Sequence, residues 1–327
     1  MGDVLNEKPT VRLVATAGAD DGRGHVGRAL ALAEALHEAG ARIELELVRG
    51  ALAPPEAARA AATGLELVVA STAAKSGSPV VVDLPVLEPT AGRFDPRVLA
   101  VFDDRDVFGG HAAIVIQPGL PAWAGPGVVD LVLAGYAYIP VSSAHRRLRE
   151  TASSRTGADE SAAPLRVVAC FGGSDPSDVT ARLVPALSSG HGWIAEVVVG
   201  SSYVGSTDGW ALASTRDPVD LPERMARADI AVIGAGTMKF EVACLGRPSL
   251  MVAVADDQLI VGPAFAATGA AGYLGDGRLI HPDVVRAAVA SLASDPPRRV
   301  SMGRVAREIV DGRGATRIAS AVLDLAR

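Results

Sequence analysis

Residues 230–241, Ile230-Ala231-Val232-Ile233-Gly234-Ala235-Gly236-Thr237-Met238-Lys239-Phe240-Glu241, lead from an apolar strand through a loop of small residues into a helix. Small side chains allow a ligand to approach the backbone of such a loop, and the start of a helix presents N–H groups to an anion. Glu241, one turn into the helix, can accept a hydrogen bond from a sugar hydroxyl. The stretch therefore indicates one half of a nucleoside-diphosphate site. The alternative is a tight turn with a solvated glutamate, because short glycine motifs often match by chance.

The composition is that of a soluble protein with two domains. The 327 residues suffice for two cores, and 49% hydrophobic with 21% charged residues is an ordinary globular balance. A net charge of −6 without a dense Lys/Arg block argues against nucleic acid as a partner. The first residues do not form a signal peptide and no apolar run is long enough for membrane insertion, so we expect a cytoplasmic protein. Cys170 and Cys244 are expected to be buried free thiols.

Apolar runs alternate with helical patterns along the first 155 residues. Strands are predicted at 11–17, 42–48, 65–69, 80–82, 98–102, 112–117, 128–134 and 136–140, with helices at 29–39 and 55–62. This alternation indicates right-handed βαβ units and a parallel sheet. We therefore expect an N-terminal Rossmann-like domain over residues 1–155.

A second series follows a stretch of small polar residues, 151–164, that is typical of a linker. Its strands are predicted at 165–171, 194–199, 230–233, 249–254 and 272–274, and its helices at 177–187, 221–226, 237–245, 258–267 and 282–293. Two helical patterns broken at Gly312-Arg313-Gly314 end the chain. We expect a second Rossmann-like domain over 164–312, and an α/β fold of two parallel-sheet domains facing across a cleft, because such sheets bind ligands at the carboxyl ends of their strands.

The loop after the first strand contains Gly22-x-Gly24-x-x-Gly27, which satisfies the dinucleotide fingerprint, with Glu44 or Glu46 about twenty residues further on. A nicotinamide or flavin enzyme is therefore one alternative. It is weakened because residues 18–21 separate the motif from its strand, and because Arg23 and His25 would crowd a pyrophosphate. His25, at the start of the first helix, can instead act as a general base, since a neutral imidazole takes a proton from a hydroxyl, water or ring N–H. Its other interpretation is a helix cap or an interface histidine.

Two further loops follow predicted strands. Gly172-Gly173-Ser174-Asp175 repeats the strand–glycine–helix pattern, so Ser174 and the N–H groups after it can bind phosphate, while Asp175 more simply caps the next helix. Asp103-Asp104-Arg105-Asp106 is similar to the Asp-x-Asp motif that binds a metal-diphosphate in one class of glycosyltransferases, but we favour a polar turn. No His/Cys cluster has zinc spacing, so no metal site is expected.

Several short motifs stand in the order found in a known group of proteins. The sequence resembles the UDP-sugar hydrolase of pseudaminic acid biosynthesis and its spore-coat-polysaccharide glycosyltransferase-like relatives, and is distantly similar to the lipid II GlcNAc-transferase. This resemblance implies a GT-B fold with the nucleotide on the C-terminal domain, no essential metal or other cofactor, and a final helix, 314–327, that packs on the N-terminal domain. The motifs are Gly22-Arg23-Gly24-His25, Phe102-Asp103-Asp104, Phe171-Gly172-Gly173-Ser174-Asp175-Pro176, Met225-Ala226-Arg227-Ala228-Asp229, Gly234-Ala235-Gly236-Thr237, Leu245-Gly246-Arg247-Pro248 and Asp257-Gln258.

The resemblance also implies roles for individual residues. The family's histidine at the reaction centre corresponds to His25, and the glutamate that binds the uridine ribose corresponds to Glu241. Both glycine-rich loops contact the diphosphate in this family, and Asp257 stands in place of an asparagine that contacts the sugar. The predicted binding residues are Gly24, Gly172, Gly173, Ser174, Gly234, Gly236, Thr237, Met238, Lys239, Glu241, Asp257 and Gln258.

The chain also departs from the family, mostly in the N-terminal half. Val14 and Thr16 replace an arginine and an aspartate, Val141 replaces an arginine, and Asp83-Leu84-Pro85 replaces Asp-His-Tyr. Lys239 is an added cation that could pair with a phosphate or a sugar carboxylate; otherwise it is a surface lysine.

These patterns predict a metal-independent glycosyltransferase that moves a sugar from a UDP-sugar to a small soluble acceptor, with His25 as general base. Relatives of this size join UDP-glucuronate to cytosine in antibiotic biosynthesis, and glucuronate would suit Lys239. A UDP-sugar hydrolase and a non-catalytic nucleotide-sugar-binding protein are the alternatives. High Ala, Gly and Arg content suggests a bacterial gene. The sequence leaves the oligomeric state open, with a homodimer as one option.

Overall fold

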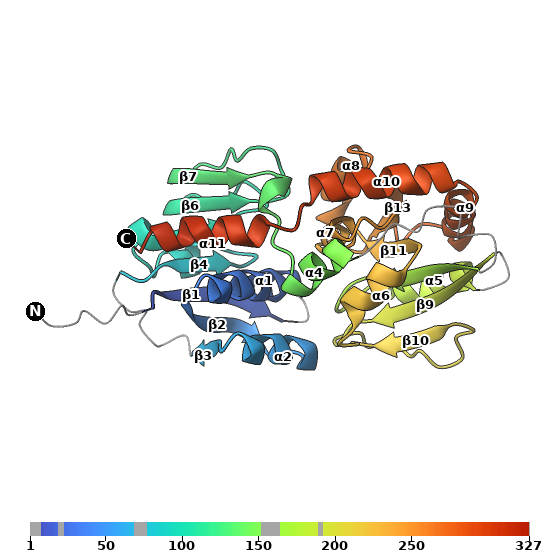
Figure 1. Ribbon diagram of the computed structural model, residues 1–327, viewed down its shortest axis with the longest axis horizontal. Coiled ribbons are helices and arrows are strands. Elements are labelled where there is room, and N and C mark those ends of the chain that lie inside the picture. Colours follow the sequence, from blue (N-terminus) through green and yellow to red (C-terminus); the bar gives the residue numbers. More distant parts are fainter. Residues whose placement is uncertain (1–7, 19–22, 69–76, 152–163, 189–191, 327) are drawn as a thin grey trace, which may run out of the picture. The chain divides into compact units, whose positions relative to one another are not determined.

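The computed structural model describes residues 8–18, 23–68, 77–151, 164–188 and 192–326, and the chain divides into two compact units (Figure 1). The first unit holds Met1–Ser143 together with Arg313–Arg327, and the second holds Ala144–Gly312. The division comes before most of helix α4 (Ser143–Thr151), so this helix belongs mainly to the second unit. All but the ends of the predicted linker, 151–164, lies outside the described residues.

A seven-stranded parallel sheet forms the centre of the first unit, in the order β3-β2-β1-β4-β5-β6-β7. Its middle strands are short and apolar, and β4 is buried along its whole length, as expected for a parallel sheet covered on both faces. The strands are β1 (Thr10–Ala17), β2 (Arg42–Gly50), β3 (Glu66–Val68), β4 (Val80–Asp83), β5 (Leu99–Phe102), β6 (His111–Gln117) and β7 (Val128–Ala134).

The first unit also contains helices α1 (Gly24–Glu38), α2 (Pro54–Ala62), α3 (Glu88–Ala91) and α11 (Gly314–Asp324), with 3-10 turns η1 (Pro96–Val98) and η2 (Tyr136–Tyr138). Helix α1 begins at Gly24 rather than at the predicted Ala29, which places His25 in its first turn. The prediction of a strand at 136–140 is wrong. Gly135, with φ of 95°, turns the chain into η2 instead, a backbone conformation that glycine adopts without steric cost.

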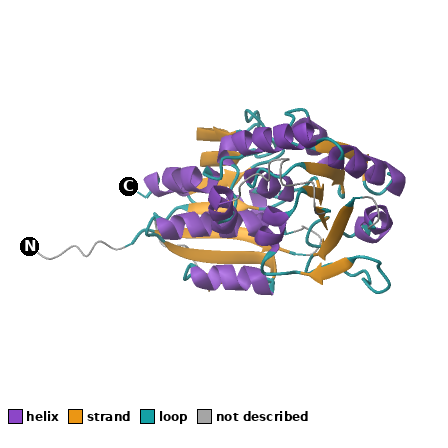
Figure 2. Cartoon of the chain, turned by 45° about the vertical axis from the view of Figure 1, so that its right-hand side comes forward, coloured by secondary structure: helices purple, strands orange, loops and turns teal. Residues whose placement is uncertain are grey.

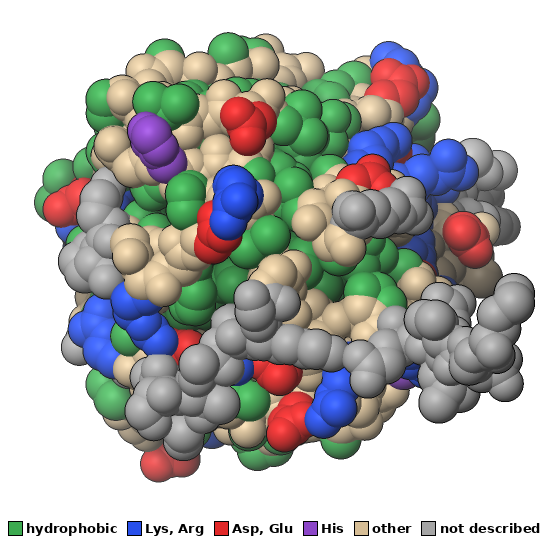
Figure 3. Space-filling view, turned by 90° about the vertical axis from the view of Figure 1, so that its left-hand side faces the viewer, with side chains coloured by type: hydrophobic (Ala, Val, Ile, Leu, Met, Phe, Trp, Pro, Cys, Tyr) green, Lys and Arg blue, Asp and Glu red, His purple; other side chains and the backbone are tan. Residues whose placement is uncertain are grey.

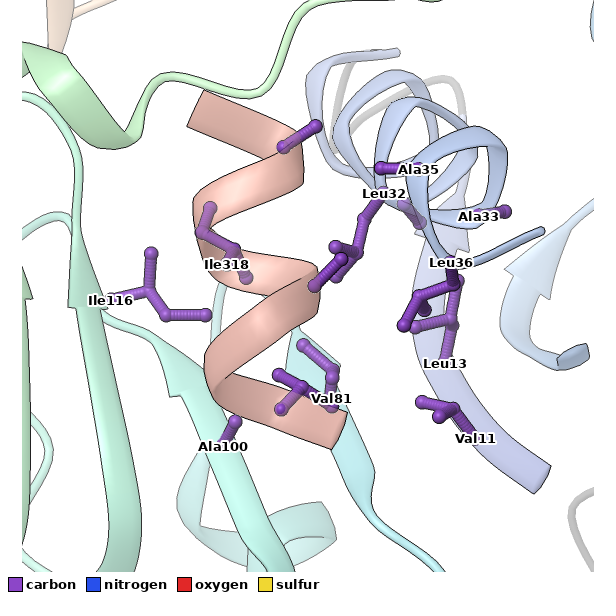
Figure 4. Close-up of a cluster of buried hydrophobic side chains, with 14 of the residues drawn as sticks. Val11, Leu13, Leu32, Ala33, Ala35, Leu36, Val81, Ala100, Ile116 and Ile318 are labelled. Atoms are coloured by element: carbon purple, nitrogen blue, oxygen red, sulfur yellow. The ribbon is translucent and has the colours of Figure 1, made fainter. Parts of the chain in front are cut away.

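The main core of the first unit lies between the sheet and helices α1 and α11 (Figure 4). Figure 4 shows Ile318 of α11 beside Ile116 of β6, while Leu32 and Leu36 of α1 lie over the strand that carries Leu13. Ile318, Leu32 and Leu36 are essentially inaccessible to solvent. Helix α11 therefore completes the core of the unit that also contains the N-terminal half of the sequence.

A six-stranded parallel sheet forms the centre of the second unit, in the order β10-β9-β8-β11-β12-β13. Figure 2 shows the strands of each sheet covered by helices. The sequence did not predict β10, because its residues Ala-Ser-Thr-Arg form no apolar run. The strands are β8 (Leu165–Cys170), β9 (Trp193–Val199), β10 (Ala213–Arg216), β11 (Ile230–Gly234), β12 (Ser249–Ala253) and β13 (Gly272–Asp276).

The helices of the second unit are α5 (Val179–Leu187), α6 (Leu221–Arg227), α7 (Met238–Cys244), α8 (Gln258–Ala266), α9 (Pro282–Ala293) and α10 (Pro296–Ile309). The core combines the strands with α5 and α9, and Trp193 is its largest fully buried side chain. Cys170 and Cys244 are free and buried, as predicted. Burial raises the pKa of Cys170 to about 12 and that of Cys244 to about 11, so both thiols stay protonated and unreactive.

Acidic and basic side chains are interspersed on the face that Figure 3 shows. None of the helices in the described part of the chain combines the length and the apolar character needed to cross a membrane.

Candidate functional site

The order of strands in each sheet reverses at one point, and that point marks where open parallel sheets bind ligands. In the first sheet the reversal lies between β1 and β4, and in the second between β8 and β11. The loops flagged in the sequence follow β1, β8 and β11. Both reversal points therefore carry predicted site residues at the carboxyl ends of the strands.

The reversal point of the first sheet brings His25 against Asp83, the last residue of β4. The Nδ1 atom of His25 lies 2.6 Å from Oδ1 of Asp83. An ionised carboxylate can only accept, so this contact places a proton on Nδ1, and in the neutral imidazole the lone pair then lies on Nε2. The His25 side chain keeps 18% of its surface exposed, whereas that of Asp83 keeps 3%. His25 thus has the tautomer and the access that a general base needs.

Arg28, one turn further along α1, holds the other side of the Asp83 carboxylate. Its Nε and Nη2 atoms donate to the two carboxylate oxygens at 2.9 and 2.7 Å, and its Nη1 donates to Asp104 at 2.5 Å. The guanidinium also lies 5.0 Å from the centre of the Phe102 ring. We call His25, Arg28, Asp83 and Asp104 the histidine cluster.

Burial and charge act in opposite directions on Asp83. Burial alone would raise the pKa of Asp83, but the charge of Arg28 and the hydrogen bonds that Arg28 and His25 donate hold it below its ordinary value. The pKa of Arg28 is raised: burial would lower it, but the charges of Asp104 and Asp83 outweigh that effect. Asp83 is therefore a carboxylate at neutral pH and keeps its orienting role.

The structure does not support the dinucleotide-binding alternative, because neither candidate glutamate stands where it could bind a ribose. Glu44 accepts from Arg12 at 2.6 Å, and Glu46, which is fully buried, accepts from Arg93 at 2.9 Å. Both glutamates lie inside β2 rather than at its carboxyl end, where such an enzyme needs them. Arg23 is engaged within the first unit, because it pairs with Glu56 and donates to the carbonyl of Ala17. Gly22 lies outside the described residues.

The Asp103-Asp104 pair forms the turn that the sequence favoured. Asp103 is buried and accepts from the Trp123 indole at 2.8 Å and the Phe108 N–H at 2.9 Å. Burial would raise the pKa of Asp103, but these donors hold it below its ordinary value. Its oxygens are therefore engaged in the turn. Within the described ranges, no group of three or more His, Cys, Asp or Glu side chains could hold a metal ion.

The reversal point of the second sheet exposes backbone N–H groups. After β11, the N–H groups of Gly236, Thr237 and Met238 find no acceptor among the described residues. After β8, the same holds for the N–H groups of Gly173 and Ser174. We call these five groups the amide cluster. Consecutive N–H groups that lack an acceptor form a cavity suited to an anion.

The glycines keep this backbone open. A Cβ on Gly234 would lie 3.2 Å from the Phe171 carbonyl oxygen, and a Cβ on Gly200 would overlap Gly173. Gly172 has φ of 108°, a conformation that disfavours any side chain. Gly24 lies in the first unit, at the start of α1, whereas the other predicted diphosphate residues lie in the second unit.

The Asp175 carboxylate accepts from the first N–H groups of α5, the capping role that the sequence favoured, although the N-cap position itself is Asp178. The buried carboxylate of Asp175 accepts from the N–H groups of Val179 at 3.0 Å and Thr180 at 2.7 Å. The expectation that N–H groups following Ser174 in α5 bind phosphate is therefore wrong for these two, because the chain's own carboxylate already occupies them.

The remaining predicted residues lie around the amide cluster. Glu241 is half-buried in the first turn of α7, and its carboxylate accepts no hydrogen bond from any described residue. Gln258 accepts from the Val254 N–H at 3.1 Å, and its Nε2 lies 3.4 Å from where a Cβ on Gly236 would be. Asp257 is exposed at the start of α8 and makes no side-chain cap there.

Lys239 is neither a surface lysine nor a cation pointing outward from the loop. Its side chain is only 4% exposed, and its Nζ donates to the carbonyl oxygens of Ala235 at 2.8 Å and Gly236 at 3.0 Å. It also lies 4.2 Å from the centre of the Phe240 ring. The expected pairing of Lys239 with a ligand is thus replaced by contacts with the loop itself.

Sequence reasoning missed Asp83 and Arg28 as parts of a site. A signal for both existed: Arg28 lies one turn after His25 on a helix, and Asp83 ends an apolar strand. Asp83 was noted only as a departure from the family's Asp-His-Tyr element. The missing information was the strand order, which places β4 directly beside β1.

Proteins of known name are similar to parts of this chain in sequence and to nearly all of it in fold. A stretch of 106 residues is 31% identical to the spore coat polysaccharide biosynthesis protein SpsG of Bacillus subtilis, covering 32% of this chain and 31% of that protein. A stretch of 178 residues is 32% identical to the UDP-N-acetylglucosamine–N-acetylmuramyl-(pentapeptide) pyrophosphoryl-undecaprenol N-acetylglucosamine transferase of Rhodopseudomonas palustris, covering 48% and 47%. The solved structure of the spinosyn rhamnosyltransferase SpnG complexed with thymidine diphosphate matches 97% of this chain and 100% of that one, with a TM-score of 0.59 at 17% identity.

The chain has the GT-B fold. The fold predicted from the sequence, and the resemblance to spore-coat proteins and to the N-acetylglucosamine transferase, are therefore confirmed. No protein-family model matches the chain. The matched stretches span only 31% and 47% of the lengths of the two curated relatives.

Proposed function

We propose that this GT-B chain is a glycosyltransferase that takes a sugar from a UDP-sugar and transfers it to a small soluble acceptor. Support comes from the relatives, one of which is named as a UDP-N-acetylglucosamine-dependent transferase, and from a structural neighbour that holds thymidine diphosphate. Because this chain matches less than half of either curated relative, the site has to carry the proposal.

The observation that carries it is the amide cluster beside Glu241. Five N–H groups that have no acceptor among the described residues stand at the reversal point of the second sheet, where they can donate to a diphosphate. The free carboxylate of Glu241 lies one turn from Thr237 and can accept from the two ribose hydroxyls. Fixed N–H donors also stabilise the charge that develops on the leaving diphosphate when the anomeric bond breaks.

The histidine cluster supplies the complementary step. Nε2 of His25 takes the proton from the acceptor O–H or N–H, whose electron pair forms the new bond to the anomeric carbon. The bond from that carbon to the diphosphate oxygen breaks, and UDP leaves with the electron pair. Asp83 holds the imidazole through Nδ1 and stabilises the imidazolium that forms.

The sugar is not assigned to glucuronate. That expectation depended on Lys239 reaching a sugar carboxylate, and its Nζ donates instead to Ala235 and Gly236. For the acceptor, a nucleobase or natural-product precursor in antibiotic biosynthesis remains our proposal. It is a class with an acidic O–H or N–H that one imidazole can deprotonate.

Thermal shift followed by a turnover assay tests this proposal. A ligand at 100 times its Kd stabilises the folded state by about 2.7 kcal/mol, so UDP should raise Tm clearly, and NAD should not. Comparison with dTDP and GDP identifies the base. Stabilisation by NAD alone would instead support an oxidoreductase.

The second stage measures UDP release from UDP-sugars with and without acceptor. Release that requires an acceptor supports a transferase. Equal release in water alone identifies a hydrolase. Tight UDP-sugar binding without release under any acceptor identifies a binding protein.

A further inference from the structure

Lys239 lies under the loop that carries three of the five groups in the amide cluster. Its Nζ donates to the carbonyl oxygens of Ala235 and Gly236 at 2.8 and 3.0 Å, from a side chain that is 4% exposed. Neither carbonyl belongs to the sheet ladder. The lysine therefore holds two successive peptide groups of the loop from one side.

The same two peptide groups carry N–H groups of the amide cluster. The Ala235 carbonyl shares its peptide plane with the Gly236 N–H, and the Gly236 carbonyl shares its plane with the Thr237 N–H. No peptide bond among the described residues is cis, and in a trans peptide the carbonyl and the N–H point in opposite directions. A cation that draws both carbonyls inward therefore turns both N–H groups outward.

We propose that Lys239 is a positioning residue for the donor diphosphate, which it serves by orienting the Gly236 and Thr237 N–H groups without touching the phosphates. The inference rests on the proposed function, since it concerns the same anion site. Lys239 fixes the carbonyl side of the loop, while the Ala235 N–H, which donates to the Val252 carbonyl at 2.8 Å, fixes its start. The glycine at 236 permits the turn, and the lysine selects its orientation.

A direct contact between Lys239 and phosphate is the competing arrangement. It would require Nζ to leave two carbonyl acceptors and the face of the Phe240 ring, and a buried ammonium pays a large cost when its partners are removed. The positioning role keeps these contacts and still adds positive charge beneath the anion.

The test compares ligands that differ only in their phosphates. Lys239→Met keeps the length and apolar stem of the side chain but donates no hydrogen bond. We expect it to weaken the binding of UDP and of inorganic pyrophosphate tenfold or more, and to leave uridine affinity within about twofold. Lys8→Met, at an exposed position, is the matched control and should change neither.

Other outcomes overturn the proposal. Unchanged UDP and pyrophosphate affinity removes Lys239 from the diphosphate site, and equal weakening of uridine shows a merely structural role. If Lys239→Met does not fold, Lys239→Gln takes its place in the test. Its carboxamide can donate to one of the two carbonyls, so its pyrophosphate affinity should fall below that of the wild type, but by less than tenfold. An unchanged pyrophosphate affinity would refute the proposal.

Wild-type binding separates this inference from the proposed function. Wild-type protein that binds pyrophosphate but not UDP refutes the UDP-sugar donor and still allows the pyrophosphate comparison to decide the role of Lys239. Wild-type protein that binds neither refutes both.

Discussion

The two reversal points of this molecule present opposite kinds of polar group. The histidine cluster consists of side chains that already satisfy one another: Asp83 is shared by His25 and Arg28, and Arg28 is shared with Asp104. The amide cluster consists of backbone groups that have no acceptor in the described part of the chain. The first is organised without a ligand, whereas the second would be completed by the anion that we propose it binds. Changes in the first should therefore affect turnover and stability, and changes in the second should affect binding.

Replacement of the imidazole should have the largest effect. His25→Ala removes the proposed base and should lower turnover by about 10²–10⁴-fold, the usual contribution of general base catalysis. UDP affinity should stay unchanged, because the amide cluster is intact. UDP release under saturating donor and isothermal titration with UDP measure the two quantities. His37→Ala, at an exposed position on the same helix, is the control; equal turnover in the two variants would exclude His25 as the base.

Asp83→Asn tests whether the histidine cluster is organised by its buried carboxylate. The change leaves the buried charge of Arg28 without the buried carboxylate that accepts two of its hydrogen bonds, and breaking such a pair costs about 3–5 kcal/mol. Urea unfolding measures this loss. Asp104→Asn is the matched control, because Asp104 keeps 41% of its side chain exposed and should cost no more than about 1 kcal/mol. Equal losses in the free energy of unfolding would show that Asp83 and Asp104 stabilise the histidine cluster equally, which contradicts the expectation.

The pH dependence of stability gives the same carboxylate a second readout. The pKa of Asp83 is lower in the folded protein than its ordinary value of 3.8, so the folded state favours the charged form. The stabilisation is complete above that ordinary value and is lost as pH falls through the lower folded pKa. Tm measured between about pH 6 and pH 3 should therefore fall less steeply in Asp83→Asn than in the wild type. Parallel curves would contradict this.

Glu241→Ala tests the amide-cluster side of the comparison. Loss of a hydrogen bond to a charged group costs about 1.5–3 kcal/mol, so UDP affinity should fall tenfold or more. Turnover at saturating donor should change little, in contrast to His25→Ala. Glu308→Ala, an exposed glutamate on α10, controls for the loss of negative charge. Unchanged UDP affinity would place the nucleotide elsewhere.

The smallest expected effect comes from Asp175→Ala. Its carboxylate caps α5, so the replacement should lower the free energy of unfolding by about 0.5–2 kcal/mol. UDP affinity should fall less than in Glu241→Ala, because Asp175 occupies N–H groups rather than a ligand. A larger loss of UDP binding than of stability would assign Asp175 to the donor site.

The same contrast explains what the sequence could predict. A site built from backbone groups can be recognised in a short stretch of sequence. The glycines at 172, 173, 234 and 236 stand between an apolar strand and a helix, and this pattern predicted the loops after β8 and β11. The alternation of strands and helices likewise predicted the two parallel sheets. Side-chain sites leave a weaker mark, since His25 and Asp83 are separated by 58 positions and meet only through the strand order.

Lys239 shows a second limit of sequence reasoning. A lysine beside an anion-binding loop was expected to bind the ligand or to lie on the surface, because its helical position gives no indication of direction. The structure turns it inward, where the carbonyls of Ala235 and Gly236 offer acceptors. The direction of the Lys239 side chain depends on these two hydrogen bonds, which the sequence pattern does not reveal.

Helix α11 has a consequence for how the chain is made. Ile318 and Val322 of this helix belong to the core of the first unit, whose strands come from the opposite end of the sequence. A ribosome therefore synthesises the whole second unit, Ala144–Gly312, before the last core helix of the first unit. Most of the inserted unit can leave the ribosome and begin to fold while an apolar strip of the first sheet is still uncovered. Nascent chains that stall before Gly314 should depend on chaperones that shield exposed apolar surface.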